Sequence, residues 1–94
     1  MTKSELVTAL AEEFDFSERK ARALIDTILD EMSEALARGE GIQLRGFGTF
    51  VIKHYKPYTG LNPKTLERVE VKAKRKPVFK VGKQLKKAVD DNRP

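Results

Sequence analysis

The 94-residue sequence predicts an α+β fold in one domain over residues 1–94: two helices, a three-stranded antiparallel sheet extended into a β-ribbon arm, and a short last helix. Apolar residues recur every three or four positions up to residue 36, which is the spacing of amphipathic helices. Between residues 42 and 81, polarity alternates and β-branched and aromatic residues are frequent, as is typical of strands. After Gly82 the helical spacing returns.

Caps mark the ends of the first two helices. Thr2 and Glu5 form a capping box, in which each side chain bonds to the backbone amide of the other, so the first helix begins there and ends near Phe14. Ser17 is the predicted N-cap of a longer helix that stops at Gly39. We interpret its wide apolar stripe as core or dimer interface rather than a cofactor site. The stripe contains Ala21, Leu24, Ile25, Ile28, Met32, Ala35 and Leu36.

The sheet begins with residues 42–44, whose alternating polarity predicts a half-buried strand. Glycines flank the first phenylalanine of the segment Gly46-Phe47-Gly48-Thr49-Phe50 and predict a tight turn whose phenylalanines anchor the sheet. Past the arm, Phe79 returns to the core. Gly82 opens the last helix, whose free N-terminal amides suit a phosphate. Residues 90–94 are predicted to be a frayed tail.

The arm is predicted over about residues 53–76. Residues 51–57 and 68–78 are both strand-like, and the Gly, Asn and Pro of the segment 59–65 reverse the chain between them. On the return strand Lys72, Lys74 and Lys76 fall at period two and share one face, while Val71, Ala73 and Arg75 take the other. One face of the arm is therefore predicted to be cationic.

Charge is sorted along the chain. Residues 1–50 carry 6 basic and 10 acidic side chains, a net charge of −4. Residues 51–80 carry 9 basic and 2 acidic side chains, a net charge of +7, and residues 81–94 add +2. Folding alone gives no reason for this separation, whereas a partner with regularly spaced phosphates does. The asymmetry predicts a polyanionic partner.

The core left after the arm is small, and small cores are commonly stabilised by disulfides, a metal or a second subunit. The sequence has no cysteine and one histidine, so dimerisation is the predicted stabiliser. The acids of the second helix form a solvated face with no catalytic pair, and we predict no enzymatic activity, cofactor, metal or small-molecule substrate. Without a signal peptide or a long apolar run, a cytoplasmic protein with no membrane partner is expected.

The order of these features resembles the bacterial histone-like HU and integration host factor family: two helices, the glycine-phenylalanine-glycine turn, a basic arm with Asn62-Pro63 at its tip, and Phe79-Lys80-Val81-Gly82-Lys83. The resemblance covers the whole chain. It implies an intertwined dimer in which helices form a base, sheets form a saddle, and two arms wrap DNA in the minor groove with a proline wedge at each tip. The wedge corresponds to Pro63.

The arm departs from the family pattern at four positions. The family usually places arginine where Tyr55, Tyr58 and Leu61 stand, and a narrow minor groove favours arginine, so weaker insertion is expected. The family has glycine where Leu66 stands. Because Leu66 does not take positive φ cheaply, we expect the tip turn to differ from the family's form.

The resemblance and the charge pattern together predict a nucleoid protein that binds, bends and compacts duplex DNA with little sequence specificity. Site-specific bending as in integration host factor stays open, as do a homodimer or a heterodimer with a paralogue, RNA binding, and a protein-interaction module. The predicted DNA contacts are Lys3, Gly46, Gly48, Lys53, Tyr55, Lys56, Tyr58, Leu61, Asn62, Pro63, Lys64, Arg68, Lys72, Lys74, Arg75, Lys76, Lys80, Lys83 and Lys86. The predicted dimer interface contains Leu24, Ile25, Ile28, Met32, Leu44, Phe47, Phe50 and Phe79.

Overall fold

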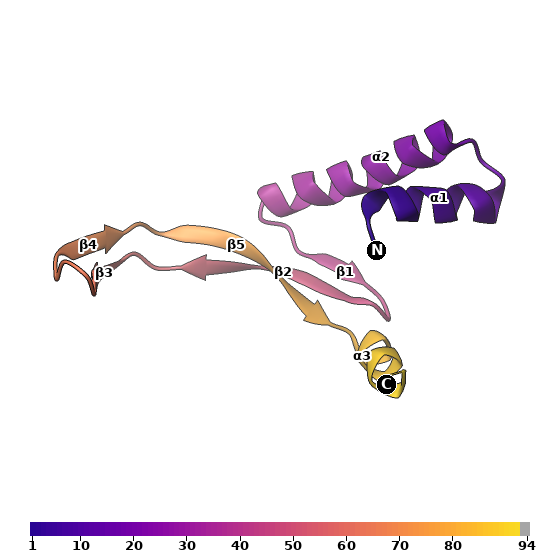
Figure 1. The fold of residues 1–94 in the computed structure, drawn as a ribbon. Coiled ribbons are helices and arrows are strands. Elements are labelled where there is room, and N and C mark those ends of the chain that lie inside the picture. Colours follow the sequence, from indigo (N-terminus) through magenta and orange to yellow (C-terminus); the bar gives the residue numbers. More distant parts are fainter. Residues whose placement is uncertain (93–94) are drawn as a thin grey trace.

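The computed structural model describes residues 1–92 and shows an extended molecule with three parts: a pair of helices, a twisted sheet drawn out into an arm, and a small helix set apart from both (Figure 1). Its radius of gyration is 19.2 Å. A compact domain of this length has a radius of about 12 to 13 Å. The protomer therefore leaves much of its apolar surface uncovered.

Helix α1 spans Lys3–Phe14 and helix α2 spans Glu18–Ala37, as the caps predict. The Thr2 hydroxyl accepts a hydrogen bond from the Glu5 amide at 3.2 Å, and Ser17 caps α2 in the same way. The second half of the capping box is different from the prediction, because the Glu5 carboxylate accepts from the Thr2 hydroxyl rather than from its amide. Asp15, at φ 53°, ends α1 in the left-handed conformation.

The core of the protomer lies between α1 and α2. Within residues 1–92 its buried apolar side chains are Val7, Ala21 and Ile25, with Leu10 and Ala11 packed against them. Ile25 was predicted at the dimer interface, but the structure places it inside the protomer, 5 % exposed. The wide stripe has two sides: Ala21 and Ile25 pack against α1, whereas Leu24 and Ile28 remain open to solvent.

The three-stranded sheet has the order β1-β2-β5 and is antiparallel throughout. Its strands are β1 (Ile42–Leu44), β2 (Gly48–Tyr55) and β5 (Lys74–Val81). Phe50 lies opposite Phe79 in the register, and their ring centroids are 4.9 Å apart. A Cβ at Gly48 would lie 2.5 Å from the Phe79 ring, so only glycine allows this close approach. The predicted turn is confirmed. Phe47 and Phe79 pack on each other but are 49 % and 39 % exposed, so they do not reach the core of the protomer as predicted.

Beyond this sheet the arm continues as a separate ribbon, β3 (Tyr58–Leu61) paired with β4 (Arg68–Val71). Residues 56–57 and 72–73 face each other unpaired between the two ladders. Pro57 explains the break, because it has no amide to donate across the ladder. The predicted reversal at residues 59–65 is also shifted: residues 59–61 belong to β3, and the chain turns over residues 62–67.

Helix α3 spans Lys83–Asp91 at the opposite end of the sheet from the arm (Figure 1). The Gly82 amide donates to the Phe47 carbonyl at 2.8 Å and fixes the start of α3 beside the glycine-phenylalanine-glycine turn. The helix has no buried residue, and Val89 is 66 % exposed. It continues through Asp91, where a frayed tail was predicted, and residues 93–94 of that tail lie outside the described residues.

The separate outer ribbon predicts unequal hydrogen exchange along the arm in the absence of nucleic acid. A two-stranded ribbon has few buried contacts and opens readily. We expect amides 56–72 to exchange within the dead time of a deuterium-exchange experiment, while the amides of residues 42–50 stay protected. Equal protection of both segments would show that the outer ribbon packs on another surface, and the prediction would be wrong.

Candidate nucleic-acid interface

One face at the root of the arm gathers three lysines around a tyrosine. Lys53 lies opposite Lys76, and Tyr55 lies opposite Lys74, so all four side chains share one face of the ribbon. The Lys74 and Lys76 ammonium groups lie 5.8 and 5.2 Å from the centroid of the Tyr55 ring, within cation–π range. We call these four residues the lysine face. Tyr55 stands where the family usually has arginine. It adds no positive charge itself, but its ring contacts the ammonium groups of two neighbouring lysines.

Lys72 lies in the break between β4 and β5, outside either ladder. Of the predicted three-lysine stripe, Lys74 and Lys76 therefore lie on the paired part of the strand. The other predicted contacts of the outer arm are exposed cations and aromatic side chains beyond the root. They are Lys56, Tyr58, Lys64 and Arg68.

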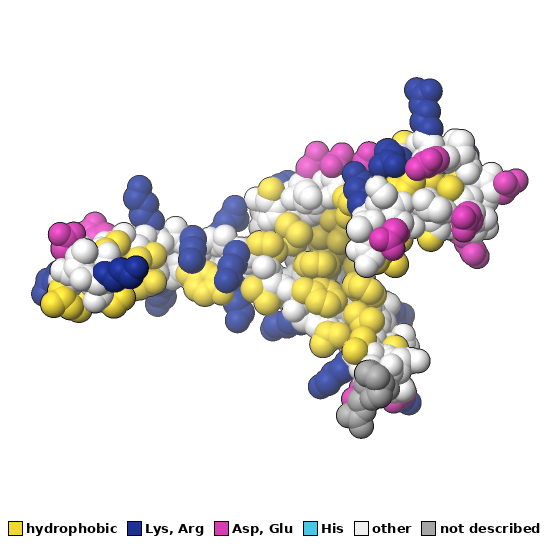
Figure 2. Space-filling view, viewed as in Figure 1, with side chains coloured by type: hydrophobic (Ala, Val, Ile, Leu, Met, Phe, Trp, Pro, Cys, Tyr) yellow, Lys and Arg dark blue, Asp and Glu magenta, His cyan; other side chains and the backbone are white. Residues whose placement is uncertain are grey.

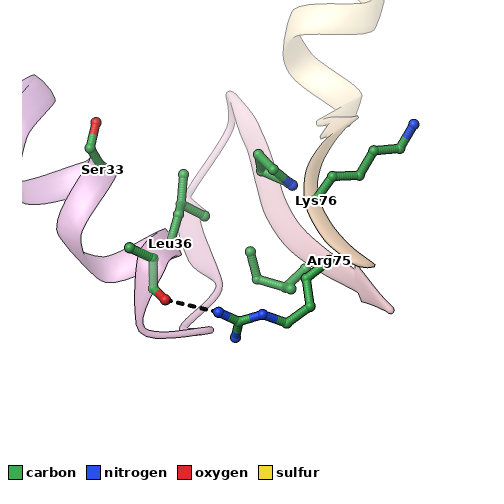
Figure 3. Close-up of a pocket in the computed structure, with 7 residues that line it drawn as sticks. Ser33, Leu36, Arg75 and Lys76 are labelled. Atoms are coloured by element: carbon green, nitrogen blue, oxygen red, sulfur yellow. Dashed lines mark hydrogen bonds between the residues drawn. The ribbon is translucent and has the colours of Figure 1, made fainter. Parts of the chain in front are cut away.

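The opposite face of the root points to the helices. Arg75 pairs with His54 in the register, and its guanidinium donates a hydrogen bond to the Ala37 carbonyl of α2 at 3.2 Å. Figure 3 shows Arg75 reaching to the end of α2 while Lys76 extends in another direction. The sequence grouped Arg75 with the DNA contacts, whereas in the structure it is bonded to the helix.

The tip of the arm is a closed turn with apolar side chains around the proline. The Leu66 amide donates to the Asn62 carbonyl at 2.7 Å, and the Asn62 amide donates to the Glu67 carbonyl at 2.9 Å. The Asn62 side chain accepts from the Lys64 amide, which holds Pro63 at the bend. Leu61 and Leu66 flank it and are 60 % and 71 % exposed. Figure 2 shows apolar side chains at the end of the arm among basic ones.

Leu66 occupies the left-handed conformation, with φ 59°. Leu66 therefore takes positive φ although its side chain makes this conformation costly. Two hydrogen bonds across the turn hold the backbone in place, and Leu66 accepts strain of about 1 to 2 kcal/mol.

Replacing Leu66 by Gly is expected to stabilise the closed tip turn, because glycine takes the left-handed conformation without steric cost. Part of this gain is lost, because glycine also has more conformational freedom in the open turn. Exchange of amides 62 and 66 with water, measured by saturation transfer, should slow by up to about fivefold. Thr65→Gly is the matched control and should speed the same exchange, since Thr65 is not at positive φ. If both variants speed the exchange of these amides equally, Leu66 is not strained.

On the body, Lys3 forms an ion pair with Asp26 of α2, and both side chains are about half exposed. Gly46, at φ 83°, lies against the side chain of Gln84, a residue in the first turn of α3 that the sequence reasoning missed. In the sequence, only the position of Gln84 directly after Lys83 indicated that it lies near the predicted contacts. Gly48 is buried beneath Phe79 and has a packing role, so the backbone contact expected of it does not fit the structure.

The remaining body cations are exposed and lie on β5 and α3. Those among the predicted contacts are Lys80, Lys83 and Lys86. Figure 2 shows Lys and Arg along the arm and most of the Asp and Glu over the helices. The structure thus keeps apart in space the charges that the sequence separates along the chain.

Two further observations concern the part of the chain that the structure describes. Residues 1–92 contain no group of three His, Cys, Asp or Glu side chains that could hold a metal ion. None of the helices within these residues is both long and apolar enough to span a bilayer.

A cationic β-ribbon arm on a small helical base is typical of proteins that bind nucleic acid. The chain belongs to the family of bacterial DNA-binding proteins, the HU and integration host factor type, which matches residues 1–90. The family resemblance and the α+β fold that the sequence predicts are both confirmed.

Individual relatives agree with this assignment. The chain is 50 % identical over 91 residues to the integration host factor subunit beta of Dechloromonas aromatica, covering 96 % of this chain and 97 % of the relative. It is 52 % identical over 93 residues to the corresponding subunit of Cupriavidus pinatubonensis, covering 98 % and 68 %. Among solved structures, Anabaena HU in a cocrystal with DNA aligns with a TM-score of 0.83 and 38 % identity, covering 95 % of this chain and 97 % of that one.

Proposed function

We propose that this protein is an architectural protein of the bacterial nucleoid that acts as a dimer and binds, bends and compacts duplex DNA through the minor groove with little sequence specificity. The lysine face carries this proposal, because lysines on a narrow ribbon contact phosphates whatever the base sequence. Family membership supports DNA as the polyanion. The function is binding and bending, without a chemical step.

The arm and the body would divide the contacts. Pro63, with Leu61 beside it, is placed at the tip to wedge between base pairs, while the lysine face holds phosphates at the root. The exposed cations of the body would follow the DNA after the bend. Among them we propose Lys3, Lys80, Lys83 and Lys86, together with the backbone at Gly46.

The uncovered apolar surface supports a second subunit. Leu24 and Ile28 on α2 are 40 % and 55 % exposed, and Phe47 and Phe79 on the sheet are 49 % and 39 % exposed. Soluble monomers rarely leave so many large apolar side chains open. We propose that these residues, with Met32, Leu44 and Phe50, form the dimer interface.

A second candidate function is site-specific bending as one half of a heterodimer, because the relatives described above are beta subunits of integration host factor. Selection from a library of random duplexes distinguishes the two. A flat sequence profile is expected if the protein binds without sequence specificity, as proposed above. A recovered consensus would instead favour the heterodimeric, site-specific function.

A gel-shift titration in a salt series tests the proposal directly. Each arm lysine that neutralises one phosphate contributes about 0.9 units to the slope of log affinity against log salt, so Lys74→Gln with Lys76→Gln should lower the slope by about 2 units per arm. Lys20→Gln, a charge-matched change over the Phe16 ring on the helical base, should leave the slope nearly unchanged. Duplex RNA and nicked DNA complete the series. Equal affinity for RNA and DNA, or no binding at moderate salt, would refute DNA-directed bending.

A further inference from the structure

The C-terminal end of α2 is capped partly from the arm. Backbone amides of residues 38–40 bond to the carbonyls of residues 34–36. The Ala37 carbonyl accepts its hydrogen bond from Arg75 Nη2, at 3.2 Å and 38 residues along the chain. The C-terminal end of a helix carries partial negative charge, so a guanidinium suits it. Arg75 therefore joins the root of the arm to the helical base.

The surroundings leave this role to Arg75. Arg38 stands at the same helix end, but its guanidinium is held by Glu40, with Nη2 and Oε2 3.3 Å apart. Hydrogen bonding and attraction to Glu40 raise the pKa of Arg38 above its ordinary value. Gly39 makes room, because a Cβ there would lie 3.1 Å from Arg75 Nη1.

Apolar packing does not fill the space between α2 and the root of the arm. A hollow of about 370 Å³ lies there, lined by Leu36, Ile52 and Pro77 among others, with Arg75 and Lys76 at its rim (Figure 3). The hydrogen bond spans the edge of this hollow. A joint without dense packing depends on its polar contact for a fixed angle.

We propose that Arg75 is a positioning residue, which fixes the angle between the arm and the helical base by holding the Ala37 carbonyl. The inference rests on the proposed function, because the arm angle decides where the tip meets DNA. Roughly ten strand residues separate Arg75 from the tip, about 30 Å at about 3.3 Å each. A rotation of about 10° at the root then moves the tip by about 5 Å, more than the spacing of about 3.4 Å between successive nucleotides.

The test measures the arm angle without DNA, so its failure is separate from failure of the proposed function. The chain has no cysteine, so Glu13→Cys on α1 and Lys56→Cys at the end of the root accept spin labels selectively. Doubly labelled protein diluted with unlabelled protein reports the distance within one protomer. In this background Arg75→Gln, Arg75→Lys, Gly39→Asn and Lys76→Gln are compared by double electron–electron resonance.

We expect a narrow distance distribution for the parent and for Lys76→Gln. Arg75→Gln should broaden it, with the ratio of docked to free arms falling about tenfold, as for loss of a charged hydrogen bond. Arg75→Lys should restore much of the narrow distribution, because an ammonium still donates to one carbonyl. Gly39→Asn should broaden it too without changing the charge, since asparagine tolerates positive φ but crowds the guanidinium.

A DNA measurement separates positioning from direct contact. Arg75→Gln should reduce bending, read by fluorescence transfer between DNA ends, while leaving the salt slope of binding unchanged. An unchanged distance distribution combined with a slope lowered by about 1 unit per arm would make Arg75 a phosphate contact and overturn the proposal. Unchanged distributions in both Arg75→Gln and Gly39→Asn would overturn it as well. If circular dichroism showed that Arg75→Gln is unfolded, the distance distribution of Gly39→Asn alone would test the proposal.

Discussion

Ile28→Asp is expected to leave the protein unfolded rather than folded and monomeric. Ile28 is 55 % exposed on the protomer, yet it stands in an apolar stripe whose buried part is limited to a few residues against α1. In a dimer the stripe would be covered, and an unpaired carboxylate there costs roughly 3 to 5 kcal/mol. Because this core is too small to sustain a separate subunit, dissociation and unfolding should coincide.

Circular dichroism measures unfolding and analytical ultracentrifugation measures dissociation, both at low micromolar protein concentration. The expected result is loss of helical signal and of the cooperative thermal transition in the Ile28→Asp protein. Thr27→Asp is the matched control, one position earlier on the acidic face of α2, and should remain folded and dimeric. A stably folded monomer, in the parent or in the variant, would show that the dimer is not obligate.

Pro63→Ala combined with Leu61→Ala is expected to abolish most of the bend while sparing affinity for straight DNA. A wedge unstacks a base step at a cost of a few kcal/mol, and the bent duplex recovers this through extra contacts. Phosphate contacts by the lysine face need no bend. Fluorescence transfer between labelled DNA ends should fall towards that of free DNA, and the preference for nicked over intact duplex should weaken.

The lysine-face double variant, Lys74→Gln with Lys76→Gln, is the control for this experiment. It should weaken binding to straight and nicked duplexes alike and flatten the salt dependence, without changing the bend of DNA that is still bound. If the tip variant loses bending and the lysine-face variant loses affinity, intercalation at the tip and phosphate binding at the root are separate functions. Full bending by the tip variant would leave Pro63 only as a turn former, and the protein would then coat DNA rather than bend it.

The features predicted correctly from the sequence are local ones. Thr2 and Ser17 cap helices within three residues of themselves, so their effect can be recognised in a short segment. The turn around Gly48 is similar, since glycines beside phenylalanine indicate close approach whatever the partner. The amphipathic period located α2 but did not show which side of its stripe faced α1, so the packing of Ile25 inside the protomer was not predicted.

The features that were missed depend on contacts between distant residues or on competing local forces. No periodicity indicates that Arg75 bonds to a carbonyl 38 residues earlier. Period two placed Arg75 on the face opposite the lysines, and its charge within the basic arm made it a candidate DNA contact. Leu66 takes positive φ although its own preference opposes that conformation. Hydrogen bonds from both sides of the turn outweigh that preference. Pro57 was visible in the sequence, but its effect on the partner strand depends on the register.

The paired break in the arm has a mechanical consequence. Two residues are unpaired on each strand, and the ladders on either side of them share one register, from Gly48 opposite Val81 to Leu61 opposite Arg68. Equal gaps let the ribbon flex there without one strand sliding past the other. The arm thus has an inner segment that Arg75 joins to the helical base and an outer segment that we expect to bend relative to it. Arg75 would then set the direction of the arm, and bending at the break would let the tip follow duplexes of different curvature.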